Sequence, residues 1–262
     1  LNCLPAEDFP SISEENFKHN FSISTSALIR LIDKTSFAMS LEETRYYLNG
    51  IYMHALKEEN KLRTVSTDGH RLSRVDMDLP EGSEKIPGVI IPRKTIMEIR
   101  KLIEDQEGSV NLSVSDNKIM VSLNNVVLTS KLLDGTFPDY SRVIPDQNDK
   151  EVVISNQLLS EAVDRVSTVS TDKTRAIKIN LNKDNMVVSA TNPEKGSASE
   201  NVKTKYDAED VEIGFNSRYV LDVARQIKGD EVVIKVSDSV SPTLVYDKED
   251  KDVLFVLMPM RV

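Results

Sequence analysis

The sequence of 262 residues has few of the side chains that form disulfides or metal sites. It contains one cysteine, three histidines and no tryptophan. A single cysteine, Cys3, cannot form an intramolecular disulfide, which favours a reducing, cytoplasmic compartment. Cys3, His19, His54 and His70 lie far apart and lack the spacing of zinc ligands. We therefore predict a cytoplasmic protein without a metal site.

Long apolar runs and glycine-rich loops are also missing. No apolar stretch reaches the ~18–20 residues that cross a bilayer, and no segment resembles a signal peptide. Glycine totals nine residues, and no GxxxxGK[ST] phosphate loop occurs. These absences argue against a membrane protein and against a P-loop nucleotide site, and no cofactor is predicted.

The remaining composition is that of a folded globular protein. Hydrophobic residues make up 39% and charged residues 29% of the chain, and its length favours two domains. Acidic residues outnumber basic ones by 42 to 33, giving a net charge of −9. An acidic balance argues against nucleic-acid binding, unless the positive charges gather on one face.

An internal repeat organises the chain. A helical pattern beginning after Ile23-Ser24 recurs after Ile154-Ser155, 131 residues later. Each copy has a second helical pattern and a later strand, and residues 112–117 match residues 234–239. Helices of about 12–15 residues among many short strands predict an α+β fold with antiparallel sheets. Each repeat is expected to place two helices against its sheets.

The repeat also predicts the domain boundaries. Phe137-Pro138 precedes the second copy, and Phe9-Pro10 lies at a similar distance before the first. We therefore expect residues 1–17 to be the tail of an earlier copy that is missing, followed by domains at 18–147 and 148–262. The alternative is a chance recurrence of the dipeptide.

Positive charge is concentrated in the predicted helices, residues 25–39, 93–106, 156–170 and 216–228. Together they carry a net charge of +3, although the whole chain carries −9. If all four lie on one side of the sheets, they form a face that attracts a phosphate backbone without reading bases. The alternative is an ordinary solvated face of mixed charge.

Two short motifs carry possible chemistry. Arg45-Tyr46-Tyr47 could contact phosphate and stack on an unpaired base, unless one tyrosine packs in the core. Asp68 and His70 could form the acid and base of a hydrolase, but a tight turn centred on Gly69 is the simpler interpretation.

The C-terminal segment is apolar and strand-like, and it ends in Met258-Pro259-Met260-Arg261. Proline stops strand pairing, so the methionines are expected to line a surface that accepts several partners. The alternative is that this segment completes a core.

Four motifs together resemble the bacterial DNA polymerase III beta subunit family, the sliding clamps. They are residues 45–50 (RYYLNG), 67–72 (TDGHRL), 130–140 (SKLLDGTFPDY) and 258–261 (MPMR). The resemblance implies a non-enzymatic processivity factor that forms a ring around duplex DNA. In that family each subunit has three similar domains with two helices each on the inner wall, and two subunits join head to tail. This chain resembles the second and third domains.

The resemblance also implies partners and binding residues. The partners would be sequence-independent duplex DNA, the polymerase III catalytic subunit, the clamp loader, repair polymerases, other clamp-motif proteins and a second full-length subunit. The implied peptide-binding groove comprises Leu48, Thr67, Gly69, His70, Arg71, Leu72, Pro138, Arg142, Val143, Val240, Val256, Leu257, Met258, Pro259, Met260 and Arg261. The implied DNA contacts are Tyr46 and Tyr47, with Arg45, Arg93, Lys94, Arg30, Lys34 and Arg100 as further candidates.

The chain departs from the family pattern at several positions. Pro242 stands beside the groove where serine is common, and Glu42 stands near the DNA-contacting segment where glutamine is common. Two other functions remain open at this point: an interaction scaffold that binds no DNA, and a hydrolase that uses Asp68 and His70.

Overall fold

A computed structural model describes residues 3, 5, 17–170 and 175–261. The Phe9-Pro10 motif, on which the missing-copy expectation rested, lies outside the described residues. No helix in the described part of the chain is long and apolar enough to cross a membrane.

Within the residues that the structure describes, each half of the chain contains eight strands and two α-helices. The first half consists of β1 (His19–Ser24), α1 (Thr25–Ser36), β2 (Gly50–Leu56), β3 (Lys61–Thr67), β4 (Arg71–Asp78), β5 (Val89–Pro92), α2 (Arg93–Leu102), β6 (Ser109–Val114), β7 (Lys118–Leu123) and β8 (Val126–Lys131). The second half consists of β9 (Lys150–Ser155), α3 (Asn156–Ser167), β10 (Ala176–Asn182), β11 (Asn185–Asn192), β12 (Gly196–Lys203), β13 (Val211–Asn216), α4 (Ser217–Ala224), β14 (Glu231–Val236), β15 (Thr243–Asp247) and β16 (Val253–Leu257). Two short 3-10 helices, η2 (Glu43–Leu48) and η3 (Tyr140–Val143), complete the described elements.

The two halves have the same topology, which confirms the predicted α+β fold. The order β1-β6-β7-β8 in the first half corresponds to β9-β14-β15-β16 in the second. Likewise, β5-β2-β3-β4 corresponds to β13-β10-β11-β12. The helices α1 and α3 also begin alike, because Ser24 and Ser155 each accept a hydrogen bond from the backbone N–H three residues later.

The helices are shorter than the sequence pattern predicts, and each ends three or four residues early. After α1, the N–H groups of Ala38 and Met39 bond to carbonyls three residues back, at Thr35 and Ser36. After α4, Gln226 and Ile227 form the same kind of bond. These turns prolong the apolar spacing beyond the last full helical turn, so the pattern alone overstates the length.

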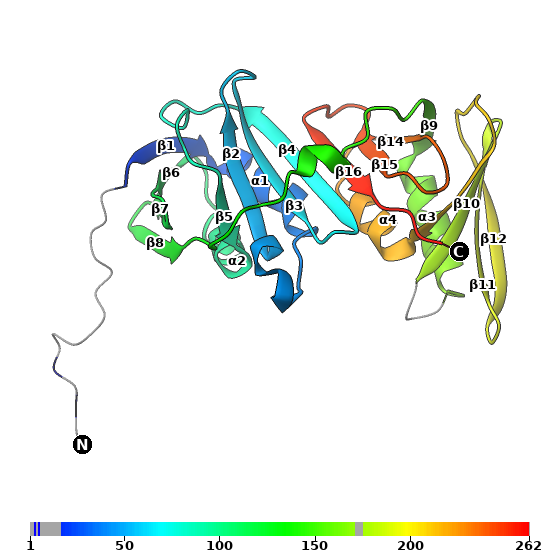
Figure 1. The fold of residues 1–262 in the computed structure, drawn as a ribbon, viewed down its shortest axis with the longest axis horizontal. Helices are drawn as coiled ribbons and strands as arrows, with labels where there is room; N and C mark the ends of the chain where they lie inside the picture. Colours follow the sequence, from blue (N-terminus) through cyan, green and yellow to red (C-terminus); the bar gives the residue numbers. More distant parts are fainter. Residues whose placement is uncertain (1–2, 4, 6–16, 171–174, 262) are drawn as a thin grey trace.

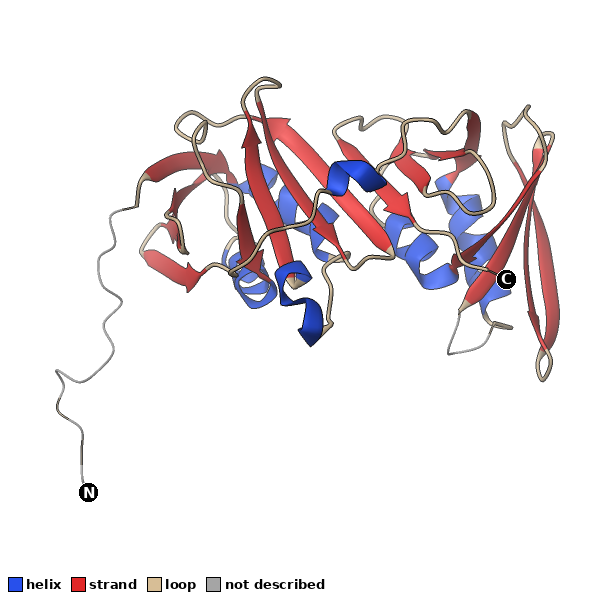
Figure 2. Cartoon of the chain, viewed as in Figure 1, coloured by secondary structure: helices blue, strands red, loops and turns tan. Residues whose placement is uncertain are grey.

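One antiparallel sheet of eight strands runs through both halves. Its order is β5-β2-β3-β4-β16-β15-β14-β9, and it is joined across the halves by pairing of β4 with β16. Figure 1 shows these two strands meeting at the centre of the molecule. In Figure 2 the four α-helices lie behind this sheet, whereas η3 crosses its front. All four helices therefore lie on one side of the sheet. The prediction of a positively charged face requires this arrangement, and the scaffold alternative does not require it.

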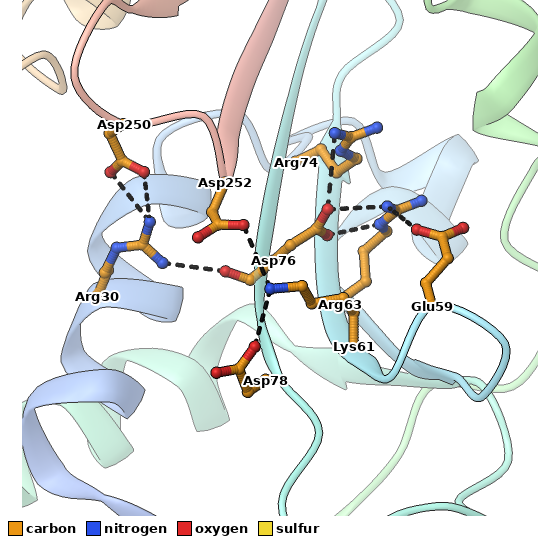
Figure 3. Close-up of polar contacts among 9 residues, drawn as sticks. All are labelled: Arg30, Glu59, Lys61, Arg63, Arg74, Asp76, Asp78, Asp250 and Asp252. Carbon is orange, nitrogen blue, oxygen red and sulfur yellow. Dashed lines mark hydrogen bonds and ion pairs between the residues drawn. The ribbon is translucent and has the colours of Figure 1, made fainter.

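Apolar and ionic contacts reinforce the junction between the halves. Phe255 of β16 is fully buried, and its ring centroid lies 5.8 Å from that of Phe37, which caps α1. At the other end of β4, Nη2 of Arg30 on α1 donates to both carboxylate oxygens of Asp250, at 2.7 and 3.0 Å. The backbone N–H of Asp76 donates to the carbonyl of Asp252 at 2.8 Å. Figure 3 shows the bonds of Arg30 to Asp250 and to the Asp76 carbonyl. The halves therefore share one core and one sheet.

We predict that Phe255→Ala lowers the free energy of unfolding by about 3–5 kcal/mol, because it leaves a cavity where the two cores meet. Chemical denaturation measures this loss. Val127→Ala, at a side chain that is 62% exposed, should change stability by less than about 0.5 kcal/mol. Equal effects of the two substitutions would contradict the shared core.

Candidate functional site

The front of the eight-stranded sheet carries side chains in cross-strand rows. Strand residues alternate between the two faces, so β2, β3, β4 and β16 each send every second side chain forward. One row joins Thr67, Leu72 and Val256, which are register partners across three strands. Leu72 and Val256 are buried in a small apolar cluster separate from the main core. This row is the floor of a surface depression shared by both halves.

The first hollow lies over this floor and has a volume of about 280 Å³. Its walls come from segments that cross the front of the sheet, η2 on one side and the connection between the halves on the other. Its lining residues are Arg45, Tyr47, Leu48, Thr67, Gly69, Arg71, Leu72, Pro138, Asp139, Tyr140, Val143, Val256 and Met258. An apolar floor with a polar rim suits the apolar side chains of a short extended peptide.

A second hollow, of about 530 Å³, follows along the C-terminal segment. Its lining residues are Glu212, Gly214, Ser239, Val240, Pro259, Met260 and Arg261. Two backbone bonds hold this segment in place, from Met258 N–H to the His70 carbonyl and from Met260 N–H to the Gly214 carbonyl, each 2.9 Å. The segment therefore runs from the first hollow to the second as a fixed strip rather than a frayed end.

The structure brings most of the predicted groove residues to these two hollows and corrects three placements. Leu257 faces the helix side, where it is buried in the main core, because it follows Val253 and Phe255 in the strand alternation. Arg142 is exposed and pairs with Asp139 at 2.9 Å instead of lining the first hollow. His70 lies at the tip of the β3–β4 turn, and its ring stacks on Tyr219 with centroids 6.2 Å apart.

The Thr67–Arg71 segment is a tight turn. Gly69 has a φ of +89°, which favours glycine. One carboxylate oxygen of Asp68 accepts the backbone N–H groups of His70 and Arg71 at 2.9 and 3.0 Å, and the other accepts Arg71 Nε at 3.1 Å. These bonds engage both carboxylate oxygens, and none involves the His70 ring. The hydrolase alternative is therefore wrong in its geometry.

Arg71 itself connects the first hollow to the helices behind the sheet. The side chain is buried and donates to Asp222 of α4 at 2.6 Å and to the Phe37 carbonyl at 2.7 Å. Its guanidinium also lies 4.5 Å from the centre of the Tyr219 ring. Asp222 and Tyr219 belong to the second half, so Arg71 ties the groove floor to both domains.

A charged row lies in the same sheet, beside the apolar floor. His54, Arg63 and Asp76 are register partners on β2, β3 and β4. Arg63 donates to both carboxylate oxygens of Asp76, at 2.6 and 2.8 Å, and both side chains are buried. Burial alone would lower the pKa of Arg63, but its hydrogen bonds to Asp76 and Tyr140 outweigh burial and raise it. The guanidinium therefore stays charged, and it donates to Tyr140, which lines the first hollow.

Seven of the eight residues predicted to meet DNA, all except Lys34, separate into three groups. Tyr46, 50% exposed, and the exposed Arg93 and Lys94 at the start of α2 are available to a ligand. Arg30 and Arg100 are engaged with Asp250 and Asp33, each at 2.7 Å. The last group, Arg45 and Tyr47, lines the first hollow instead, and Glu42 holds Arg45 at 2.9 Å.

Lys34 corrects the prediction of a DNA contact. It is buried, its ammonium group donates to the Gln226 carbonyl of the second half, and burial lowers its pKa. The sequence pattern assigned the Lys34 charge to the exposed face of the helix. Gln226, which covers it, lies 192 positions away in the sequence, so the local pattern does not reveal this contact.

Sequence reasoning missed Asp139 and Tyr140 as lining residues, and it assigned Arg45 and Tyr47 to DNA alone. A period-2 analysis of the strands would have separated Leu257 from Val256 and Met258. Among residues 17–170 and 175–261, together with 3 and 5, no three His, Cys, Asp or Glu side chains gather as metal ligands would.

Comparison with known proteins is consistent along the whole chain. Residues 22–139 match the family model of the DNA polymerase III beta subunit central domain, and residues 141–261 match that of its C-terminal domain. The chain is similar to the beta sliding clamp of Caulobacter vibrioides, with 50% identity over 100% of this chain and 71% of the relative. It is also similar to that of Pseudomonas aeruginosa, with 42% identity over the same shares.

Solved structures give the same result. The structure resembles a sliding clamp from Bartonella birtlesii bound to griselimycin, with a TM-score of 0.95 and 50% identity over 100% of this chain and 71% of that one. A Pseudomonas aeruginosa polymerase sliding clamp with a ligand gives a TM-score of 0.94 at 42% identity, covering 99% and 70%.

We predict that Asp76→Asn lowers the free energy of unfolding by about 3 kcal/mol, because it leaves the Arg63 charge buried without its main partner. Denaturant titration at neutral pH measures the change. Asp78→Asn is the matched control, since Asp78 is 87% exposed in its pair with Lys61, and it should cost less than about 0.5 kcal/mol. The double variant Arg63→Met, Asp76→Leu should regain most of the loss; no recovery would contradict this assignment.

Proposed function

We propose that the two hollows form one peptide-binding groove, because the chain belongs to a family whose members bind partner proteins. This family is the DNA polymerase III beta subunit family, the sliding clamps. The protein is a non-catalytic processivity clamp of the replicative DNA polymerase. Its partners in general are DNA and polymerases, and it works as a dimer. The proposals below concern which residues make those contacts.

The first hollow carries the peptide proposal. Its floor is apolar, it is built by strands of both halves, and its walls leave about 280 Å³ open to ligand. Leucine and phenylalanine side chains of an extended peptide would bury apolar surface there, and Arg71 and the exposed rim would meet its polar backbone. The second hollow, lined by Met260 and Arg261, would hold the next residues of the same peptide.

The DNA proposal rests on the helix side of the sheet. All four α-helices lie on that side, opposite the segments that wall the groove. Arg93 and Lys94 at the start of α2 would contact the phosphate backbone without reading bases. Tyr46 would be a further contact from η2, outside the helix side. Because a closed ring keeps its hold by topology, a weakly positive wall on an acidic protein is enough and allows sliding.

The repeat supports a proposal for ring closure. The strand pair that joins the halves is β4 with β16, and the repeat equivalents of these strands are β12 and β8. Both β8 and β12 are edge strands of their sheets. We infer that each receives an equivalent strand, β8 from a preceding domain and β12 from the other subunit.

The specific partners follow as proposals from the same groove. They are the polymerase III catalytic subunit, the clamp loader, repair polymerases and other proteins that carry a clamp-binding peptide. All would compete for one site, and the protein would act in the cytoplasm, where the bacterial chromosome is replicated.

The peptide proposal predicts saturable, micromolar binding of a fluorescent peptide of the Gln-Leu-x-Leu-Phe type. Met260→Ala should weaken it by about tenfold, since it removes apolar contact in the second hollow. Fluorescence anisotropy measures the affinity, and Met97→Ala, at an exposed methionine on α2, is the matched control. A folded chain that does not bind, or that loses as much affinity with the control, would contradict the assignment.

The DNA proposal predicts weak, sequence-independent binding to a short duplex at low salt. Reversing Arg93 and Lys94 to glutamate should lower the slope of log K against log salt by about 1 for each lost phosphate contact. Anisotropy titrations at several salt concentrations give the slope. Reversing Lys57 and Lys85, which are exposed in turns, is the charge-matched control; equal slopes for the two double variants would argue against the helix wall.

A further inference from the structure

One wall of the first hollow has little structure of its own. Residues 138–143, here called the wall segment, connect the two halves and contribute Pro138, Asp139, Tyr140 and Val143 to the lining. The segment contains one short 3-10 helix, capped by Asp139, and most of its side chains are exposed. Its position therefore depends on contacts with the sheet beneath it.

Aromatic rings supply part of that support. Phe137, which precedes the wall segment, is buried and stacks on Tyr52 with centroids 4.8 Å apart and an interplanar angle of 4°. Tyr52 in turn stacks on His54 at 4.8 Å, and the ring of Tyr140 lies 5.8 Å from His54. Four rings thus form a continuous series from one end of the wall segment to its middle.

The Tyr140 hydroxyl makes the polar contacts. Its oxygen lies 2.9 Å from His54 Nε2 and receives a hydrogen bond from Arg63 Nη1 at 3.3 Å. A guanidinium only donates, so the phenol hydrogen is left to donate to His54. With His54 neutral and its Nε2 as acceptor, both the hydrogen and the oxygen of the Tyr140 hydroxyl have partners.

Arg63 is held in place by two carboxylates, those of Asp76 and Glu59. Asp76 accepts two of its N–H groups, and Glu59 accepts a third at 3.3 Å (Figure 3). The backbone of Asp76 also joins the domain junction, through Arg30 Nη1 at 3.1 Å and the Asp252 carbonyl at 2.8 Å. The hydroxyl of Tyr140 therefore bonds to a network that continues to the boundary between the halves.

The groups around His54 favour its neutral form. It faces Tyr52 on its own strand, Arg63 on β3, Asp76 on β4, Glu59 in the β2–β3 turn and Tyr140 on η3. Burial is the main cause of its lowered pKa, and Arg63 adds to the shift, while Asp76 and Glu59 oppose it. Protonation would remove the acceptor of the Tyr140 hydrogen and place a second cationic donor, beside Arg63, against the Tyr140 oxygen.

We propose that Tyr140, His54 and Arg63 are positioning residues for peptide binding: the bonds of the Tyr140 hydroxyl hold the wall segment in the place where it closes the first hollow. The proposal deepens the proposed function and rests on it. Peptide affinity then depends on two residues, His54 and Arg63, that do not line the hollow, and it falls when His54 gains a proton.

The test compares wild type, Tyr140→Phe and His54→Gln, with the acetylated peptide Gln-Leu-Ser-Leu-Phe, from pH 8 to pH 5. At pH 8, Tyr140→Phe should bind about fivefold more weakly, the effect of one lost hydrogen bond. His54→Gln should bind like wild type, because the glutamine oxygen also accepts a hydrogen bond. Tyr246→Phe, on the distant β15, is the matched control and should change nothing.

The pH profile separates positioning from general loss of packing. Stability and wall position contributed by neutral His54 are complete above its unfolded pKa of ~6.5 and are lost as pH falls through its lowered folded pKa. Wild-type affinity should therefore fall at acid pH, with a smaller fall in Tyr140→Phe and His54→Gln. Apart from positions 54 and 140 the three proteins are identical, so the difference between profiles reports the contact of His54 with Tyr140. Circular dichroism at each pH confirms that the fold is kept.

The outcomes distinguish the two levels of the account. If wild type does not bind the peptide at pH 8, the proposed function itself fails. If wild type binds and Met260→Ala weakens it, but Tyr140→Phe binds equally well with the same pH profile, the positioning role is overturned. If Tyr140→Phe does not fold, the pH profiles of wild type and His54→Gln are compared instead. Identical profiles for these two proteins would overturn the positioning role.

Discussion

The pairing of β4 with β16 is the contact on which the rest of the molecule depends. It converts two four-stranded sheets into one of eight strands, and it sets Leu72 opposite Val256. That register places side chains from both domains in the floor of the first hollow. It also sends Phe255 backward against Phe37, so the same strand joins the cores. Groove, core and domain orientation therefore follow from one set of backbone hydrogen bonds.

The two faces of this sheet serve different purposes because strand residues alternate. Behind it lie the four α-helices with their positive residues, on a protein whose net charge is −9. In front lie the two hollows and the segments that wall them. Arg71 links the sides, since it lines the first hollow and pairs with Asp222 of α4 at 2.6 Å. The proposed function needs this division, with DNA on one side and partner peptides on the other.

Much of the architecture was predictable from sequence, because a repeat and short motifs are local signals. The 131-residue offset predicted equivalent helices, and residues of the TDGHRL and MPMR motifs line the two hollows of the proposed groove. Placement of single side chains was less predictable. Residues 253–257 are all apolar, so hydrophobicity does not show which of them face the groove, and only their period-2 spacing separates Leu257 from Val256. Lys34 is covered by Gln226 of the other domain, and Tyr140 bonds to His54 86 positions away; such contacts leave no mark in local pattern.

Hydrogen exchange of the backbone amides tests most directly whether the β4–β16 pairing is the structural basis of the groove. The account predicts that amides in β4 and β16 exchange only on global unfolding, as slowly as those in the central strands β3 and β15. Exchange of the β4 and β16 amides that is orders of magnitude faster, while the amides of both domain cores stay protected, would show that the domains separate without unfolding. That result would contradict a groove preformed by both.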